Sequence, residues 1–159
     1  MVNINLSGWT PEHFKTFANH LAYNRLAKAA ALLPLVVTSW DLDGDPTDPE
    51  SYKTLSFVDA APFMKEVEAE VVRLFQEVSI PEGLVINLRP WTMEDYQKYS
   101  ERVARNDYTG AMKYLIPVIE MWPWSEEVSE KSMLKMNIEQ FGSITKAVGQ
   151  AVNDSFRAG

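Results

Sequence analysis

The sequence contains no cysteine and two histidines. Without thiols the chain forms no disulfide framework and performs no cysteine chemistry. His13 and His20 lie seven residues apart in one predicted helix, and no cysteine accompanies them as a metal ligand. We interpret both as surface or boundary residues, with a metal pair as the alternative.

Catalytic and phosphate-binding motifs are missing as well. The seven glycines are dispersed at expected turns and caps, so no glycine-rich phosphate loop is present. No nucleophile elbow and no Ser, His and Asp set can be recognised. Glu12, Glu94 and Asp95 fall in predicted first turns of helices, where a carboxylate stabilises the helix dipole. We therefore expect no catalytic residue and no cofactor, and we predict that the protein is not an enzyme.

Long apolar runs and clusters of basic residues are also absent. The longest apolar stretch, residues 29–37, is too short to cross a membrane and contains Pro34. Residues 1–4 show no basic start with an apolar stretch after it, so we expect no secretory signal and a cytoplasmic location. The net charge is −7, and the 15 basic residues are scattered. This balance argues against nucleic acids and anionic membranes as partners, and it suits either a protein partner or solubility alone.

A nine-residue pattern occurs twice in the chain. Ile-Asn-Leu-x-x-Trp-Thr-x-Glu spans residues 4–12 and returns at residues 86–94, at an offset of 82 positions (86 − 4 = 82). Matches continue downstream at an offset of 82, then 81: Asn24 with Asn106, Leu33 with Leu115, Trp40 with Trp122, Ser51 with Ser132, Val67 with Val148, and Phe75 with Phe156. We interpret the chain as one unit used twice, with residues 1–79 and 84–159 joined by a linker at 80–83. Units this small bury a modest core, so we expect the two repeats to pack together as one pseudo-symmetric domain.

Each repeat is predicted to contain a short N-terminal strand and three to four helices, so the fold class is mainly α with minor β. Residues 2–6 and 84–88 are the expected strands, because both are apolar and end at turn formers. A pseudo-dyad would allow these two strands to pair with each other. Thr10 and Thr92 are candidate N-caps of amphipathic helices with apolar residues at i, i+3, i+4 and i+7.

The remainder of each repeat is predicted to be a proline-interrupted segment and a closing helix. Asn24 and Asn106 tolerate the left-handed conformation that ends helices. Pro34 and Pro117 lie inside the next apolar pattern, where proline removes a helical hydrogen bond. That helix is therefore either kinked or replaced by an extended segment, and the β-branched residues that follow leave both open. The closing helices have N-terminal signatures at Ser56-x-x-Asp59 and Asn137-x-x-Gln140.

Three closely spaced aspartates form an acidic turn in the first repeat. Asp41, Asp43 and Asp45 could chelate calcium, because hard cations prefer clustered carboxylates. Glycine, however, stands at the fourth position of this segment rather than the sixth, and the twelfth residue is Tyr52 rather than glutamate. We favour a solvated acidic turn over a metal site, and we keep the three aspartates as candidate protein-binding residues.

Tryptophan and methionine distinguish the second repeat. Four of the five tryptophans are at matched positions, which favours a role in the core. Trp124 has no counterpart, so we expect it to be exposed, and an exposed tryptophan beside methionines suits a partner surface. Gap-filling in a core is the alternative for the methionines. The candidate protein-binding residues are Met121, Trp124, Met133 and Met136.

Three segments form a further pattern: Leu-Arg-Pro-Trp-Thr-Met-Glu-Asp-Tyr at 88–96, Val-Val-Thr-Ser-Trp-Asp-Leu-Asp-Gly-Asp-Pro at 36–46, and residues 51–55 with the closing helix. Together they resemble the tail assembly chaperones of long-tailed bacteriophages. The second repeat departs from the pattern, since Pro-Trp-Ser at 123–125 replaces the Asp and Gly turn. The resemblance implies a mainly helical protein without active-site residues. It also implies that the protein binds and solubilises the tape-measure protein in the infected bacterial cell and helps to recruit tail-tube subunits.

The leading functional prediction is thus a non-enzymatic protein-interaction module that serves as a tail assembly chaperone or scaffold. The alternatives are a structural component of the virion and an inhibitor of a host defence protein that acts by occluding its surface. The expected partner is a phage tape-measure or tail-tube protein, or a host protein. Self-association into a homo-oligomer is left open.

Overall fold

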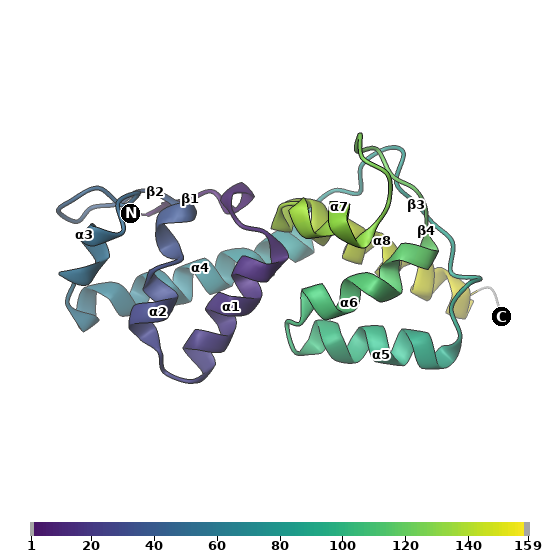
Figure 1. Ribbon diagram of the computed structural model, residues 1–159, viewed down its shortest axis with the longest axis horizontal. Helices are drawn as coiled ribbons and strands as arrows, with labels where there is room; N and C mark the ends of the chain where they lie inside the picture. The colour runs from purple at the N-terminus through teal and green to yellow at the C-terminus, as the bar shows by residue number, and fades with distance from the viewer. Residues whose placement is uncertain (1, 158–159) are drawn as a thin grey trace.

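The computed structural model describes residues 2–157. Its described residues are 62% helical, with eight α-helices and two small antiparallel sheets. This confirms the predicted class, mainly α with minor β. Figure 1 shows an elongated molecule in which residues 2–79, the first half, and residues 84–157, the second half, follow each other along the long axis. The predicted ends of the two repeats, residue 1 and residues 158–159, lie outside the described part.

The two halves contain nearly the same elements in the same order. The first half comprises β1 (Asn3–Ile4), the 3-10 helix η1 (Leu6–Gly8), α1 (Pro11–Ala22), α2 (Leu26–Ala30), η2 (Leu33–Leu35), β2 (Val37–Ser39), α3 (Glu50–Lys53) and α4 (Phe57–Glu77). The second half comprises β3 (Val85–Ile86), α5 (Met93–Ala104), α6 (Tyr108–Leu115), η3 (Ile116–Val118), β4 (Ile119–Met121), α7 (Glu130–Lys135) and α8 (Ile138–Arg157).

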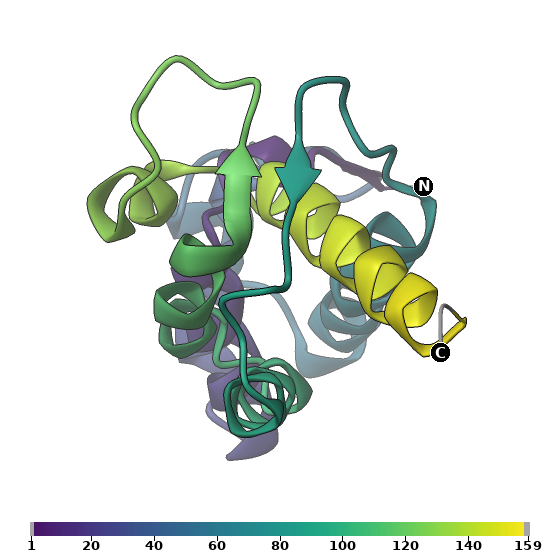
Figure 2. The same cartoon turned by 90° about the vertical axis from the view of Figure 1, so that its right-hand side faces the viewer.

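Each N-terminal strand pairs within its own half. β1 is antiparallel to β2, and β3 is antiparallel to β4, as Figure 2 shows for the second pair. The hypothesis that the two N-terminal strands pair with each other is therefore wrong. The reason is local, because the chain turns back after each proline and returns an extended segment to the strand before it. Asn5 N–H donates to the Val36 carbonyl at 2.7 Å, and Asn87 N–H donates to the Val118 carbonyl at 2.8 Å.

The proline segments are tight turns rather than kinked helices. Pro34 lies in η2 and Pro117 lies in η3. η3 is followed directly by β4, and Val36 alone separates η2 from β2. Proline lacks an N–H group, so the helical hydrogen-bond pattern stops there. The β-branched residues that follow these turns lie in β2 and β4, which pair with β1 and β3, respectively. Of the two conformations left open by the sequence, the structure has the extended one.

The helix boundaries lie where the capping residues indicate. The hydroxyls of Thr10 and Thr92 accept backbone N–H groups in the first turns of α1 and α5. The Asp95 carboxylate in turn accepts from Thr92 N–H at 2.9 Å, which completes a capping box. Asn24 and Asn106 have φ angles of 57° and 59°, so the predicted left-handed residues are confirmed.

Matched tryptophans make matching contacts in the two halves. The indole N–H groups of Trp9 and Trp91 each donate to the carbonyl 23 residues further along, at 3.0 and 2.7 Å. Those of Trp40 and Trp122 each donate to the carbonyl four residues further along, at 2.8 and 2.6 Å. These correspondences agree with one unit used twice, and the duplication itself stays an interpretation of the sequence.

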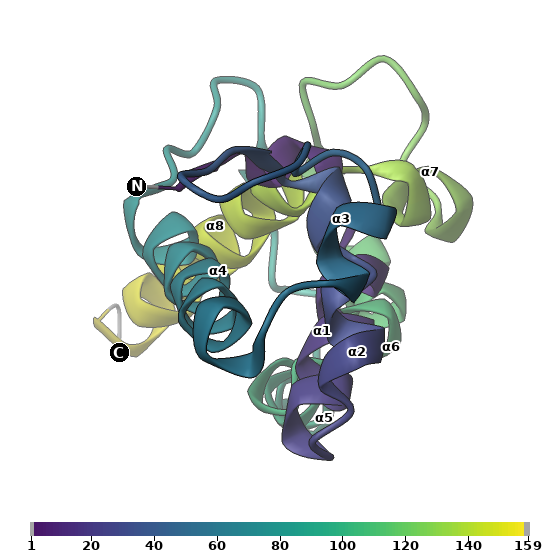
Figure 3. The same ribbon diagram turned by 90° about the vertical axis from the view of Figure 1, so that its left-hand side faces the viewer.

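The buried apolar side chains of the two halves form one cluster. α4 packs against α8, and α1 packs against both α6 and α8. The end-on view in Figure 3 shows α4 and α8 next to each other. Trp9, Phe17 and Phe141, from both halves, are among the largest side chains without exposed surface. The core therefore crosses the boundary between the halves.

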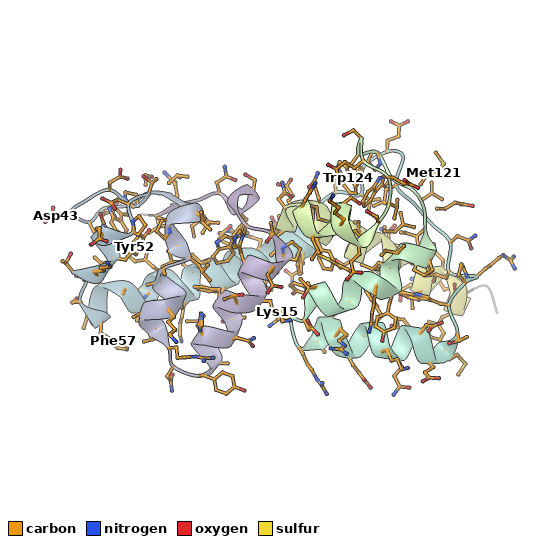
Figure 4. The ribbon with its side chains drawn as sticks, viewed as in Figure 1. Lys15, Asp43, Tyr52, Phe57, Met121 and Trp124 are labelled. Carbon is orange, nitrogen blue, oxygen red and sulfur yellow. The ribbon has the colours of Figure 1, made fainter. Side chains whose placement is uncertain are left out.

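Polar contacts also join the halves. Ile138 N–H, at the start of α8, donates to the carbonyl of Trp9 at 2.8 Å. Lys15 of α1, labelled in Figure 4, lies 2.8 Å from the Asp107 carboxylate, which also binds Arg102 at 2.7 Å. Partial burial raises the pKa of Asp107, but the hydrogen bonds from Lys15, Arg102 and a backbone N–H outweigh it and hold that pKa at about 2. Asp107 is therefore charged at neutral pH and ties α1 to the start of α6.

Candidate protein-binding site

The segment between β4 and α7 carries two tryptophans, and we call residues 122–129 the tryptophan loop. Trp122 donates its indole N–H to the Glu126 carbonyl at 2.6 Å, which closes the loop on itself. The ring of Trp124 packs edge-on against that of Trp122, with centroids 5.4 Å apart. Both residues are half-buried, so each keeps a surface that another molecule can contact. Figure 4 shows Trp124 on a loop that projects from the second half.

The loop differs from its counterpart in the first half. There, Trp40 packs on two aromatic rings from α3 and α4, with centroids 5.0 and 5.6 Å away. The matched positions of the second half carry no aromatic side chain, and the aromatic neighbour of Trp122 is Trp124 from the loop itself. The unmatched tryptophan, which the sequence singled out, is thus part of a structure that the first half lacks.

A cavity of about 230 Å³ lies beside the tryptophan loop. Its walls include Trp122, Trp124 and Met136, together with the polar side chains of Lys135 and Gln140. This volume is below the roughly 300–1,000 Å³ of small-molecule sites. The cavity is suited to a protruding side chain of a protein partner, held by apolar walls with a polar rim.

The four predicted apolar contact residues divide into two groups. Met121, at the end of β4, is 59% exposed, and Trp124 is half-buried beside the cavity. Met133 has no exposed surface and Met136 is almost fully buried. Met133 therefore fills the core, which was the alternative role for the methionines, and its contact with a partner stays a prediction. Met136 is open to the outside where it lines the cavity.

The three predicted aspartates lie on a separate surface. Figure 4 places Asp43 at the end of the molecule far from the tryptophan loop. Asp45 accepts the N–H and the hydroxyl of Thr47 at 2.9 and 2.7 Å, and these bonds, the backbone one first, lower its pKa. The Trp40 indole N–H closes the turn on the Gly44 carbonyl at 2.8 Å. Within residues 2–157, no three His, Cys, Asp or Glu side chains are grouped as metal ligands.

Sequence reasoning missed an apolar groove in the first half. It lies between α2, α3 and α4, has a volume of about 340 Å³, and its walls include Leu26, Ala30, Leu55, Phe57 and Met64. Phe57, the first residue of α4, is 68% exposed and lies at the outer end of the first half in Figure 4. Apolar residues in these helices indicate a core, so the pattern alone could not reveal that the groove is open at Phe57.

A second missed surface is the start of α5. Met93 is 89% exposed and Tyr96 is 38% exposed, beside a half-buried Trp91. The ring of Tyr96 lies 6.0 Å from that of Trp91. The resemblance covers these residues, but nothing in their pattern separates them from the buried start of α1.

Comparison with known proteins gives no match to any family model, curated protein or solved structure. Of the helices between residues 2 and 157, none is long and apolar enough to cross a membrane.

Proposed function

We propose that the protein is a non-enzymatic protein-interaction module that holds an apolar side chain of a protein partner at the tryptophan loop. The observation that carries this proposal is the cavity beside Trp122 and Trp124, next to the exposed Met121. Tryptophan is enriched among the residues that dominate interface energies, and methionine adapts to irregular apolar partners. A contact of this size also suits reversible binding, because a small buried area leaves little surplus over the cost of association.

Among such modules, a phage tail assembly chaperone or scaffold is the specific role that we propose. The resemblance of residues 36–46 and 88–96 to that family supports it, and so do the two tryptophans of the loop. The partner is then the hydrophobic tape-measure protein or a tail-tube protein in the cytoplasm of the infected cell. A structural role in the virion and occlusion of a host defence protein are the alternatives, since an interaction surface serves either.

Co-expression with the tape-measure protein tests this role. We expect the wild-type chain to raise the soluble fraction of that protein several-fold, and Trp124→Ala to lose most of the gain. Val72→Ala is the matched control, because Val72 is 54% exposed on α4, outside the loop. A wild-type chain that gives no gain, or a Trp124→Ala variant as active as the control, would count against the proposal. Abundant chain in purified virions would instead favour a structural component.

A further inference from the structure

The interface between the halves consists of the start of one half seated in a recess of the other. Trp9 has no exposed surface, and its carbonyl accepts from Ile138 N–H at 2.8 Å. The ring of Phe14 stacks on Tyr108 at 5.9 Å with an interplanar angle of 17°. Tyr108 in turn packs on Phe141 at 5.1 Å. The recess is therefore formed by α6 and the start of α8, and α1 begins inside it.

The matched recess of the first half is the apolar groove between α2, α3 and α4. The offset of 81 pairs Phe57 with Ile138 (138 − 57 = 81) and Ala60 with Phe141 (141 − 60 = 81). Ile138 and Phe141 have no exposed surface, whereas Phe57 is 68% exposed. The recess of the second half is thus covered, whereas the matched groove of the first half is uncovered.

The matched start of the second half is uncovered too. The offset of 82 pairs Trp91 with Trp9 and Tyr96 with Phe14. Trp9 is fully buried and Phe14 is 4% exposed, whereas Trp91 is half-buried and Tyr96 is 38% exposed. Between them Met93 projects with 89% of its surface exposed. The molecule therefore carries one uncovered recess and one uncovered segment of the kind that fills the other recess.

We propose that the start of α5 in one molecule docks in the groove between α2, α3 and α4 of a second copy of the chain, so that copies assemble head to tail. The second copy is the occupant because the chain already makes this contact once, between its own halves. The Trp91 carbonyl would accept from Phe57 N–H, as Trp9 accepts from Ile138 N–H. The first N–H of a helix such as α4 has no acceptor within the helix.

Side-chain sizes fit this pairing. The groove has Ala30 and Ala60 at the positions where the covered recess has Met112 and Phe141. These smaller side chains leave space in the groove for the long side chain of Met93, at the start of the docking α5. Packed interfaces require such complementarity of volume, since overpacking and voids both cost free energy.

Charges select α5 rather than α1 as the entering helix. Within one molecule Lys15 of α1 binds Asp107, the N-cap of α6. The N-cap of α2 is Arg25, so α1 of another copy would bring Lys15 against a like charge. α5 carries Gln97 at the position of Lys15, and Gln97 binds Glu101 at 3.2 Å. That carboxylate would then face the Arg25 guanidinium.

The two uncovered surfaces lie at opposite ends of the molecule. Phe57 marks one end in Figure 4, and α5 begins at the other end in Figure 1. One molecule therefore cannot join its own two surfaces. A contact between unlike surfaces is heterologous, and it produces either closed rings or open chains.

Sedimentation equilibrium over a concentration series tests the proposal. We expect the average mass of the wild type to rise above the monomer mass with concentration. Phe57→Asp and Met93→Glu each change a mostly exposed side chain, so the fold is kept, and each should weaken association at least tenfold. A mixture of the two variants retains one intact groove and one intact α5 start, so it should form a 1:1 dimer and nothing larger.

Val72→Glu is the control, because it adds the same charge at an exposed position of α4 outside the groove. It should associate like the wild type, and unfolding curves of all variants should match. A wild type that stays monomeric throughout, or a mixture that stays monomeric, overturns the proposal. Equal loss of association in Val72→Glu overturns it as well, because the association is then not specific to the groove. These outcomes leave the proposed role of the tryptophan loop untouched.

Discussion

Trp9 and Trp91 show how one residue type at matched positions takes on different roles. Both donate the indole N–H to a backbone carbonyl, so both anchor the start of their half. Trp9 is fully buried because the second half covers it, whereas Trp91 is half-buried. The anchoring could be predicted from residue type and position. The difference in burial could not be predicted, because it depends on which element packs over each ring.

Truncation of Trp9 should therefore cost more stability than truncation of Trp91. Trp9→Ala removes a fully buried ring and leaves a carbonyl without its donor, so we expect a loss of about 3–5 kcal/mol in the free energy of unfolding. Trp91→Ala should lower the free energy of unfolding by clearly less, because part of that ring is already exposed to water. Urea unfolding of the two variants measures this, and equal losses would show that the second half does not cover Trp9.

Asp107 should give the stability a specific pH dependence. Its pKa is lowered from 3.8 to about 2 in the folded protein, so its contribution is fully present above pH 4 and is lost as the pH falls towards 2. The shift corresponds to about 2 kcal/mol. The stability difference between the wild type and Asp107→Asn should shrink by roughly that amount between pH 4.5 and pH 2, measured by urea unfolding. A difference independent of pH would contradict the ion pairs with Lys15 and Arg102.

At the scale of elements, local sequence signals predicted where helices begin, but they did not predict which elements pair or pack together. The caps Thr10, Thr92 and Ser56 lie at the N-termini of α1, α5 and α4, since a capping side chain acts on its own first turn. The partners of the strands were mispredicted, because strand pairing depends on how the chain turns back after Pro34 and Pro117. The hydrophobic periodicity also could not show which face of α8 packs against α4.

Two glycines of α8 test which face of that helix packs against α4. A Cβ atom at Gly142 would lie 2.8 Å from the Phe75 ring of α4, whereas one at Gly149 would meet no atom within 4 Å. Gly142→Ala should therefore lower the free energy of unfolding by about 1–3 kcal/mol through overpacking. Gly149→Ala should raise it by about 0.5–1 kcal/mol, because alanine loses less backbone entropy in a helix. Thermal unfolding of both variants measures the signs, and the same sign at both positions would contradict this packing.

At the scale of the whole molecule, the two halves share one buried cluster and the contact from Trp9 to Ile138. The fold class could be predicted from the sequence, whereas Trp124, which we expected to be exposed, is half-buried. The burial of Met133 could not be predicted, because a methionine at helical spacing fits a core and a surface equally well. The sequence also contained no sign of the groove, because exposure is a property of the assembled halves.

The shared core predicts that the halves unfold together. Unfolding followed by tryptophan fluorescence should coincide with unfolding followed by far-ultraviolet circular dichroism, because the tryptophans are spread over both halves. The experiment is best done at a concentration where the chain is monomeric. Two separated transitions would show that each half is stable alone.

The position of the groove and of the α5 start at opposite ends has a consequence for valency. A linear assembly of n chains displays n tryptophan loops but a single free groove and a single free α5 start. A ligand of the loops therefore gains avidity as the assembly lengthens, whereas a ligand of the groove acts as a cap and stops growth at that end. Small amounts of a groove-blocking peptide would then set the length of the assembly without occupying its sides.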